Sequence, residues 1–369
     1  MQVAVLKETA ARENRVALTP ESAGRLVKSK VDVVVQRGAG ERAGFWDDAY
    51  AALGVRLADD ASATCAGARI VLKVQPPAGD EVAMFGPESV LVSLLRPGHL
   101  APLAQQLAAR RVSALALELV PRITRAQTMD VLSSQSTVVG YKAVLVGASE
   151  LGKFLPMLTT AAGNIQPARV FVIGAGVSGL QAIATARRLG GVVSAFDVRP
   201  AAREQVLSLG ATFVAADVVS DTAETSGGYA RAQTDDERAN TLTAIATHIK
   251  DVDLVITNAQ VPGQPAPRLI AEAVVQRMRA GSVIVDLAAE NGGNCELTRA
   301  GETVRTHGVT IIGPVNLAST VPFHASQMFG RNVLALLNHM ITKEGMLTVD
   351  PNDEITGAML VTHDGKVLR

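Results

Sequence analysis

Three glycines and one aspartate have the residue types and spacing of a dinucleotide-binding site. Residues 169–190 read RVFVIGAGVSGLQAIATARRLG, an apolar run followed by Gly174, Gly176 and Gly179 and then by a helix-forming segment. In that context the first glycine permits a tight turn, the second lets backbone N–H groups approach a pyrophosphate, and the third lets helix and strand pack closely. The next apolar run ends in Asp197, eighteen residues after Gly179, close to the ~20 expected of an acid that accepts hydrogen bonds from a ribose. We therefore predict that these residues bind a dinucleotide.

Asp197 also bears on which dinucleotide is bound. A carboxylate that accepts both ribose hydroxyl groups would repel the 2′-phosphate of NADP, so the sequence favours NAD(H). Arg199 and Arg203 lie close by in the sequence, and we expect them to form a solvated helix face with salt bridges. They do not reverse the preference for NAD(H).

Residues 121–136, PRITRAQTMDVLSSQS, form a second polar segment that follows an apolar run ending near Glu118. The carboxyl ends of strands are where open α/β sheets bind ligands, so this segment is a candidate for ligand contact. The alternative is a capped, solvent-facing loop that leads into a helix. The residues alone leave both interpretations open.

A third polar segment, residues 215–241, interrupts the alternation of strands and helices and contains Gly227, Gly228 and Tyr229. Loops of this length inside a compact domain are usually lids or disordered insertions. We favour a lid, because an aromatic side chain held next to glycines can move over a bound ligand.

The rest of the chain must position these segments at the ends of strands. Short runs rich in Val, Ile and Leu alternate with longer segments of helical period, the pattern of parallel strands joined by crossover helices. We predict an α/β fold with two doubly wound, Rossmann-like domains joined by long helices, one of residues 1–133 plus 325–369 and one of residues 134–324. The predicted strands are 3–7, 31–36, 70–74, 90–94 and 113–117 in the first domain, and 170–173, 192–196, 212–214, 254–257, 282–286 and 310–312 in the second.

Local signals assign several other segments. Thr19 and Pro20 predict a helix start, with an N-cap hydroxyl followed by proline at the first helical position. Residues 133–160 and 323–340 are predicted to be long helices that connect the domains. Asp364-Gly365 predicts a hairpin turn in a tail that returns to the first domain.

Composition excludes several classes of function. A length of 369 residues suggests two domains, and 48% hydrophobic with 19% charged residues excludes a disordered chain. Because 35 basic residues balance 35 acidic ones, there is no sequence-wide basic field for nucleic acid. Two cysteines without a Cys-x-x-Cys pattern and six scattered histidines predict neither a disulfide framework nor a metal site, which favours the cytoplasm. We also expect no secretion signal and no membrane span, since no apolar run approaches the ~18 residues required.

Several segments together resemble the proton-translocating NAD(P) transhydrogenases over essentially the whole chain. The segments are KETAARENRVALTP, VLKVQPP, ELVPRITRAQTMDVLSSQS, GAGVSG with its aspartate, ETSGGYA, VDLAAENGGN and GAMLVTHDGKVLR. The chain looks like the separate, NAD(H)-binding alpha subunit of that family. The resemblance implies a Re/Si-specific, proton-translocating transhydrogenase that transfers hydride between NADH and NADP⁺, with the NADP(H) held by a partner subunit.

The resemblance also implies roles for individual residues. Those expected to orient the nicotinamide ring are Arg122, Gln127, Asp130 and Ser133, of which Gln127 would reach toward the partner's cofactor. The expected NAD(H) contacts are Gly174, Gly176, Val177, Gly179, Asp197, Val198, Arg199, Gly228, Tyr229 and Gln260. Gln260 stands where an aliphatic residue is usual in the family. The resemblance further implies a homodimer, an NADP(H)-binding beta subunit and a membrane-spanning subunit, which would make the chain cytoplasmic and peripheral to the inner membrane.

Alanine dehydrogenase is the rival relative, because it shares the two-domain plan and the RVALTP segment. Arg15 and Lys73 match positions that bind a 2-oxo acid there, and we expect them to be structural or vestigial here. Where those enzymes place a catalytic histidine, this chain has Arg96, with His99 three residues away. Arginine stays protonated and cannot act as the acid–base group that keto-acid amination needs. The alternatives are an oxidoreductase acting on a 2-oxo acid and ammonia, and a non-catalytic NAD(H) sensor.

Overall fold

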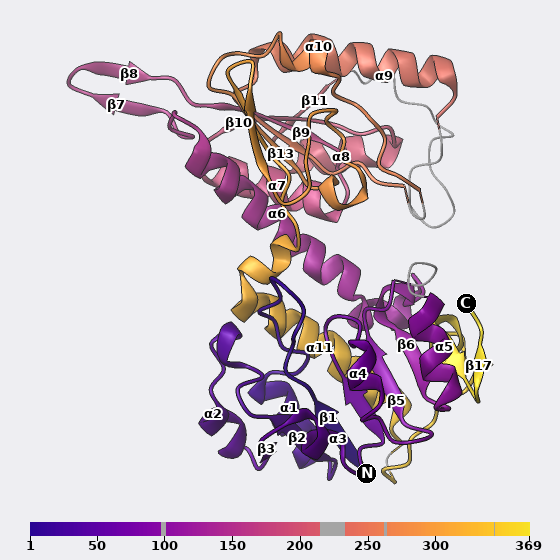
Figure 1. Cartoon of the computed structure of the whole chain (residues 1–369). Coiled ribbons are helices and arrows are strands. Elements are labelled where there is room, and N and C mark those ends of the chain that lie inside the picture. Colours follow the sequence, from indigo (N-terminus) through magenta and orange to yellow (C-terminus); the bar gives the residue numbers. More distant parts are fainter. Residues whose placement is uncertain (97–100, 215–232, 262–263, 343) are drawn as a thin grey trace. The chain divides into compact units, whose positions relative to one another are not determined.

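The computed structural model describes residues 1–96, 101–214, 233–261, 264–342 and 344–369. Its contacts divide the chain into unit 1, Met1–Gln135 with Ala318–Arg369, and unit 2, Ser136–Leu317 (Figure 1). The sequence predicts boundaries at 133/134 and 324/325, whereas Ser134, Gln135 and residues 318–324 group with unit 1. The reason is that these residues form hydrogen bonds with the rest of unit 1. Ser134 Oγ donates to Asn332 Oδ1 at 2.7 Å, and Asn14 N–H donates to Ser319 Oγ at 2.7 Å.

Unit 1 is built on one eight-stranded sheet in the order β17-β16-β6-β5-β4-β1-β2-β3. The six strands from β6 to β3 are parallel neighbours. The strands are β1 Gln2–Val5, β2 Asp32–Gln36, β3 Arg56–Ala58, β4 Ile70–Leu72, β5 Val90–Ser93, β6 Ser113–Ala116, β16 Leu360–His363 and β17 Lys366–Val367. The helices are α1 Pro20–Lys28, α2 Asp47–Ala51, α3 Ala61–Cys65, α4 Gly79–Val82, α5 Ala101–Ala109, α11 Pro322–Met340 and α12 Thr356–Met359, with short 3-10 turns at η1 Glu41–Ala43, η2 Leu117–Leu119 and η3 Thr124–Met129.

Alternating side chains along β1 pack into two hydrophobic cores, one on each face of this sheet. Val3 and Val5 of β1 belong to one hydrophobic core, whereas Ala4 and Leu6 belong to another. Because successive side chains of a strand point to opposite faces, two separate cores mean that the sheet is covered on both sides. This is the doubly wound architecture that the apolar runs predicted.

The C-terminal tail completes the sheet of unit 1. β16 pairs antiparallel with β6 and with β17, and both turn residues, Asp364 and Gly365, have positive φ. Two consecutive positive φ values match the two-residue turn that suits the twist of a hairpin. The prediction of a hairpin that returns to the first domain is confirmed.

Unit 2 is built on a seven-stranded sheet in the order β11-β10-β9-β12-β13-β15-β14. Only the β14–β15 pair of this sheet is antiparallel among the described strands. The strands are β9 Arg169–Ile173, β10 Val192–Phe196, β11 Thr212–Phe213, β12 Leu254–Thr257, β13 Val283–Asp286, β14 Thr303–Thr306 and β15 Val309–Ile312, and a separate hairpin joins β7 Leu158–Thr160 to β8 Gly163–Ile165. The helices are α7 Val177–Arg188, α8 Pro200–Ser208, α9 Asp235–His248 and α10 Glu272–Val275, with 3-10 turns at η5 Ile249–Asp251 and η6 Ala289–Asn291.

The strand order of unit 2 defines where a ligand can bind. The chain passes from β9 outward to β10 and β11, then crosses back so that β12 pairs with the other side of β9. In open α/β sheets, ligands bind at the carboxyl ends of the strands where the order reverses in this way. That point in unit 2 lies after β9 and β12.

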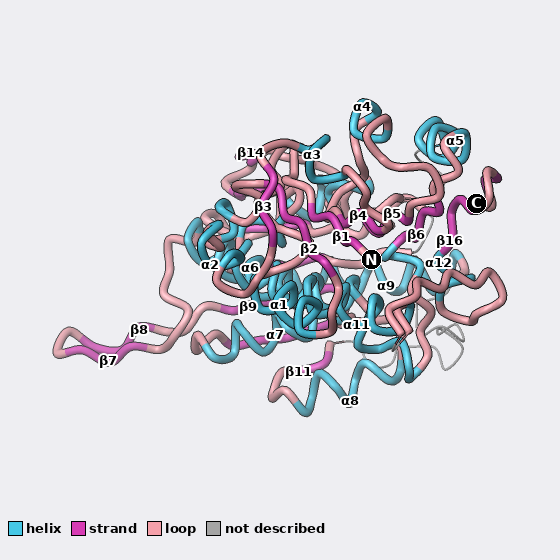
Figure 2. Tube along the Cα trace, turned by 90° about the horizontal axis from the view of Figure 1, so that it is seen from below, coloured by secondary structure: helices cyan, strands magenta, loops and turns pink. Residues whose placement is uncertain are grey.

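Three short strand segments were missed and one was wrongly assigned. β3, β14 and the β7–β8 hairpin have few residues each and no apolar alternation, so nothing in the sequence marks them. Residues 158–160 were predicted to be helical, but α6, which covers Val131–Glu150, ends before Gly152 and Pro156. Leu158–Thr160 then pairs antiparallel with Gly163–Ile165, and Figure 2 shows this hairpin extending away from the sheet of unit 2.

The long helices also differ in part from expectation. α6 crosses the boundary between the units, as predicted, but α11 lies wholly within unit 1. Thr19 is the N-cap residue of α1 with Pro20 in the first turn, yet the Thr19 side chain makes no capping hydrogen bond. Within the described ranges, no helix is long and apolar enough to span a membrane.

Candidate functional site

The turn after β9 is one that only glycine fits. Gly174 has a φ of +94°, and a Cβ atom there would lie 2.3 Å from Asn258 Oδ1. A Cβ on Gly179 would lie 1.9 Å from the carbonyl oxygen of Gly174. Both distances are far below van der Waals contact, so a larger residue would displace the Asn258 side chain at position 174 and the backbone of the loop at position 179.

Gly176 is different, because a Cβ at this position would meet nothing within 4 Å. Gly176 is the N-cap residue of α7, and Val177, the first residue of the helix, is 42% exposed. The first N–H groups of a helix have no partner within the helix and carry partial positive charge. The loop therefore offers open space beside the backbone donors of a helix N-terminus, which is what a pyrophosphate requires.

Asp197 follows β10 at the same edge of the sheet and is 6% exposed. Its Oδ2 atom accepts a hydrogen bond from the N–H of Ala175 in the glycine loop at 2.7 Å. Its Oδ1 atom accepts from the backbone N–H of Arg199 at 2.9 Å, and the Arg199 guanidinium forms an ion pair with the same carboxylate. The predicted ribose acid thus lies against the predicted pyrophosphate loop, so the structure brings these two parts together.

Asn258 lies against the glycine loop and was not predicted from the sequence. It follows β12, its backbone N–H donates to the carbonyl of Ile173, and its Nδ2 donates to Ser178 Oγ at 3.0 Å. It therefore supports the glycine loop from the neighbouring strand at the point where the strand order reverses. A polar residue directly after an apolar strand was the only available signal.

The remaining residues of unit 2 that were predicted to contact NAD(H) lie in different surroundings. Val198 is partly buried against the core around Phe196. Gln260 is exposed, donates to the carbonyl of Leu287 at 3.3 Å and accepts from Asn291 Nδ2 at 3.2 Å. Gly228 and Tyr229, and with them the predicted lid, lie outside the described residues.

The polar segment of unit 1 forms the 3-10 turn η3 and the start of α6. Arg122 and Gln127 are exposed, whereas Asp130 and Ser133 are half-buried. The Asp130 carboxylate accepts from the backbone N–H of Ser133 at 2.9 Å and from its hydroxyl at 2.6 Å. Asp130 therefore caps the start of α6, which is the capped loop that the alternative interpretation predicts. A contact of Asp130 and Ser133 with a ligand would come in addition to this capping role.

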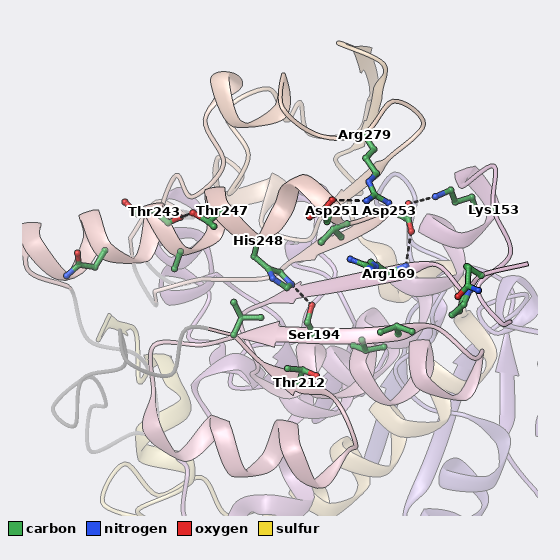
Figure 3. Close-up of a pocket in the computed structure, with 18 residues that line it drawn as sticks. Lys153, Arg169, Ser194, Thr212, Thr243, Thr247, His248, Asp251, Asp253 and Arg279 are labelled. Atoms are coloured by element: carbon green, nitrogen blue, oxygen red, sulfur yellow. Dashed lines mark hydrogen bonds and ion pairs between the residues drawn. The ribbon is translucent and has the colours of Figure 1, made fainter.

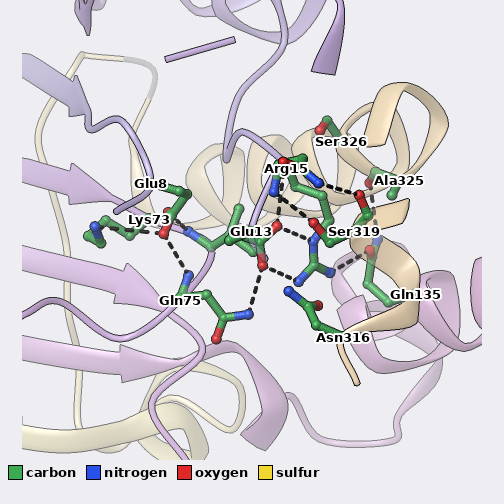
Figure 4. Close-up of polar contacts among 12 residues, drawn as sticks. Glu8, Glu13, Arg15, Lys73, Gln75, Gln135, Asn316, Ser319, Ala325 and Ser326 are labelled. Atoms are coloured by element: carbon green, nitrogen blue, oxygen red, sulfur yellow. Dashed lines mark hydrogen bonds and ion pairs between the residues drawn. The ribbon is translucent and has the colours of Figure 1, made fainter. Parts of the chain in front are cut away.

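Arg15 and Lys73, the positions shared with alanine dehydrogenase, are buried and neutralised by carboxylates of this chain. Arg15 forms an ion pair with Glu13 at 2.7 Å, and Lys73 contacts Glu81 at 2.9 Å and Glu8 at 3.7 Å. Figure 4 shows that Lys73, Glu8, Gln75, Glu13 and Arg15 are linked in one polar network. The network is internally satisfied, which agrees with a structural role for both cations.

The two carboxylates at the centre of this network have shifted pKa values of opposite sign. Burial raises the pKa of Glu8 to about 7, against the lowering effect of Lys73 and of the Val74 N–H group. Burial also acts to raise the pKa of Glu13, but the hydrogen bonds and charge of Arg15 outweigh it and lower that pKa to about 2. Glu8 therefore titrates near neutral pH while Glu13 stays ionised.

We expect the Glu8→Gln variant to change how stability depends on pH. Between about pH 4.5 and 7 the folded state holds a proton on Glu8 that the unfolded state releases, so this carboxyl lowers the free energy of unfolding as pH rises. Glutamine removes that slope, and the variant should gain stability relative to the wild type between about pH 5 and pH 8. Urea unfolding at both pH values measures the difference. A variant that lost more stability at the higher pH than at the lower one would contradict this assignment.

Position 96 lacks the acid–base histidine of the rival enzymes. Arg96 follows β5, is exposed and has a φ of +46°, and its backbone N–H donates to Glu118. His99 lies outside the described residues. Over the described ranges, no cluster of three or more His, Cys, Asp or Glu side chains is arranged to hold a metal ion.

A groove lies at the opposite, amino-terminal edge of the unit 2 sheet, where β9, β10 and β11 begin (Figure 3). Four of its charged side chains form two ion pairs: Lys153 contacts Asp253 at 2.6 Å and Arg279 contacts Asp251 at 2.7 Å. Because ligands bind at carboxyl ends in this fold, the groove does not correspond to the predicted cofactor site. The glycine loop and Asp197 remain the candidate site of unit 2.

Comparison with known proteins finds two family domains that together cover most of the chain. The model of the alanine dehydrogenase/PNT N-terminal domain matches residues 4–139, and that of the alanine dehydrogenase/PNT C-terminal domain matches residues 143–369. The chain is 44% identical to an NAD(P) transhydrogenase subunit alpha protein of Rhodospirillum rubrum, over 100% of this chain and 98% of that protein. It is 31% identical to alanine dehydrogenase of Halomonas elongata, over 100% of this chain and 94% of that protein.

A solved structure supports the same grouping. The transhydrogenase from Sinorhizobium meliloti is similar with a TM-score of 0.88 and 40% sequence identity, over 100% of this chain and 99% of that chain. Identity to transhydrogenases is clearly higher than identity to alanine dehydrogenase. The chain therefore belongs to the alanine dehydrogenase/PNT family, and within that family to the alpha subunits of NAD(P) transhydrogenase.

Proposed function

We propose that this chain binds NAD(H) and exchanges a hydride with NADP(H) held by a partner subunit. The observation that carries the proposal is the glycine loop of unit 2, where open space at Gly176 meets the N-terminus of α7 and the carboxylate of Asp197 contacts the same loop. These groups have the chemistry to hold a pyrophosphate and a ribose. Bound NADH supplies the hydride.

The residues of unit 2 hold the cofactor in this proposal. The N–H groups near Gly176 and Val177 bind the pyrophosphate, and Asp197 accepts from the adenosine ribose. Gly174 and Gly179 keep the backbone close, as their missing Cβ atoms allow. The other proposed contacts are Val198, Arg199, Gly228, Tyr229 and Gln260.

The polar segment of unit 1 orients the nicotinamide ring in this proposal. Asp130 and Ser133 hold one another at the start of α6, so their groups are fixed before any ligand binds. Gln127 and Arg122 are exposed, so their side chains can face a second cofactor. Hydride transfer between two nicotinamide rings needs their C4 atoms about 3–3.5 Å apart with water excluded, and it needs no acid–base group. Amides, hydroxyls and an arginine are sufficient for that positioning.

The partners follow from the family. We propose an NADP(H)-binding beta subunit that receives the hydride and a membrane-spanning subunit that couples the reaction to proton passage. The chain would then be peripheral to the inner membrane through those subunits. Re/Si specificity belongs to the same proposal, because it is fixed by the face of the ring that each subunit presents.

We also propose that the chain forms a homodimer, and the β7–β8 hairpin supports this. The hairpin pairs with no other described strand, and the apolar side chains of Phe154, Met157 and Ile165 beside it and on it are 56%, 60% and 42% exposed. An isolated two-stranded hairpin is at best marginally stable in water, so a second copy that covers these side chains would stabilise it.

The double variant Met157→Lys with Ile165→Lys should therefore dissociate the dimer. Burying two ammonium groups in an apolar contact costs several kcal/mol, which corresponds to at least about a hundredfold weaker association. Analytical ultracentrifugation measures the change. Leu207→Lys, at a 49% exposed position on α8, is the control and should leave the dimer intact. An undiminished dimer in the double variant would place the interface elsewhere.

The experiment that tests the proposed function compares two reactions of the isolated chain. Fluorescence titration first establishes that NADH binds. NADH oxidation is then followed with pyruvate and ammonium, and we expect no turnover until an NADP(H)-binding subunit and NADP⁺ are added. Turnover with pyruvate and ammonium alone would support the alanine-dehydrogenase alternative and assign catalytic roles to Lys73 and His99.

A further inference from the structure

The carboxylate of Asp197 is fully engaged by groups of the protein itself. Oδ2 accepts from the Ala175 N–H at 2.7 Å and from Arg199 Nη2 at 3.0 Å. Oδ1 accepts from the Arg199 backbone N–H at 2.9 Å and from Arg199 Nε at 2.9 Å. A carboxylate has about four acceptor positions, so these four donors fill it.

We propose that the Arg199 guanidinium occupies the two acceptor positions that a ribose diol needs, so that a ribonucleotide binds Asp197 only by displacing it. This inference rests on the proposed NAD(H) function and gives Arg199 a defined part in it. Arg199 is a specificity-determining residue that acts by competition: it lowers what the two hydroxyl groups contribute to binding.

The four donors differ in how easily they can leave. The N–H groups of Ala175 and Arg199 are backbone, fixed by the glycine loop and by the N-cap of α8. The guanidinium is at the end of a long side chain that is 18% exposed, next to a carboxylate that is 6% exposed. Arginine regains hydration readily when it moves outward, whereas the buried carboxylate needs new donors in its place. Two vicinal hydroxyl groups match the two donors that leave.

The exchange has a direct energetic consequence. Each hydrogen bond from the diol to Asp197 is gained only as one from Arg199 is lost, so the net benefit of the diol in the wild type is small. Without the guanidinium, the carboxylate keeps its two backbone donors and has two empty acceptor positions. The two hydroxyl groups of the diol then donate to these empty positions and contribute strongly to the free energy of binding.

The test is a cycle that combines one protein change with one ligand change. Calorimetry measures the Kd of adenosine 5′-monophosphate and of 2′,3′-dideoxyadenosine 5′-monophosphate for the wild type and for Arg199→Met. The ratio of the two Kd values reports the contribution of the diol. We expect this ratio to be about tenfold larger in Arg199→Met than in the wild type, because charge-assisted hydrogen bonds of this kind are among the stronger ones.

Two further variants make the result specific. Arg203→Met removes the same charge from an exposed position four residues along, on α8, and should leave the wild-type ratio. Arg199→Lys keeps the charge but offers a single ammonium, and its ratio should fall between the other two. If Arg199→Met does not fold, the ratio measured for Arg199→Lys still tests the inference.

The outcomes separate this inference from the function on which it rests. A ratio that is unchanged or smaller in both Arg199 variants, with NADH still bound by the wild type, overturns the competition and leaves the proposed function standing. Failure of the wild type to bind either adenosine 5′-monophosphate or NADH overturns both. An increase of equal size in Arg203→Met would show that general charge, and not the bond to Asp197, controls the effect.

Discussion

The Gln127→Asn variant should slow hydride transfer about a hundredfold while changing the Kd of NADH by less than about threefold. Gln127 is exposed on η3, so its amide is available to a partner subunit. Asparagine keeps the amide but withdraws it by one carbon–carbon bond. Misplacing a positioning group by about 1 Å can cost about 10²-fold in rate, since this chemistry depends on alignment.

Single-turnover kinetics with the NADP(H)-binding subunit measures the rate, and fluorescence titration of the isolated chain measures the Kd. Thr128→Ser is the matched control, because Thr128 is the adjacent exposed side chain and loses one carbon in the same turn. Loss of binding and of rate by the same factor in Gln127→Asn would mean that the amide holds NADH rather than aligning the two rings.

The Asp197→Ser variant should shift the preference for NADH over NADPH by about a hundredfold. Removing the carboxylate removes the repulsion of a 2′-phosphate, whereas the affinity for NADH changes little because the ribose diol gains little from Asp197 in the wild type. It also releases the Arg199 guanidinium, now paired with Asp197, to bind the phosphate. Hydrogen bonds to charged groups contribute about 1.5–3 kcal/mol each, so the two changes together reach this factor.

Titration with NADH and NADPH under identical salt conditions measures the preference. The double variant Asp197→Ser with Arg199→Met is the control, and it should lose the part of the gain in NADPH affinity that Arg199 supplies. An Asp197→Ser variant with unaltered preference would show that another residue selects the cofactor.

The parts of the site that the sequence predicted are those encoded by neighbouring residues. Gly174, Gly176 and Gly179 lie within six positions, and their roles follow from the backbone alone, so the structure could be anticipated there. The doubly wound fold was predictable for the same reason, because buried parallel strands are continuous apolar runs. Other short strands were not, since β3 and the strands of the β7–β8 hairpin have three residues each and no turn or apolar signal that marks them.

Contacts between distant residues could not be predicted. Asn258 supports Gly174 across eighty-four positions of sequence, and no local pattern marks that pairing. The surroundings of Arg199 also differ from expectation: its sequence position suggests a solvated helix face, but its guanidinium is bonded to the acid that defines the site. Segment 121–136 remained ambiguous because an aspartate can act either as a helix cap or as a ligand contact. Asp130 serves as the cap, and its residue type alone does not distinguish the two roles.

The buried cations of unit 1 show a similar limit. Arg15 and Lys73 are marked by sequence as shared with an enzyme that binds 2-oxo acids, but only the structure shows the carboxylates that neutralise them. Glu13 is two residues from Arg15, whereas Glu8 reaches Lys73 from the segment that follows the neighbouring strand β1. Pairing across a sheet depends on strand order, which residue spacing does not reveal.

The most direct test of the central claim follows the hydride itself. NADH carrying deuterium at the transferable C4 position is mixed with this chain, an NADP(H)-binding transhydrogenase subunit and NADP⁺, and the NADPH is examined by mass spectrometry. The proposed function predicts deuterium in NADPH, none released to water, and no transfer when the partner is omitted. Absence of label in NADPH, together with deuterated alanine formed by the chain alone from pyruvate and ammonium, would contradict it.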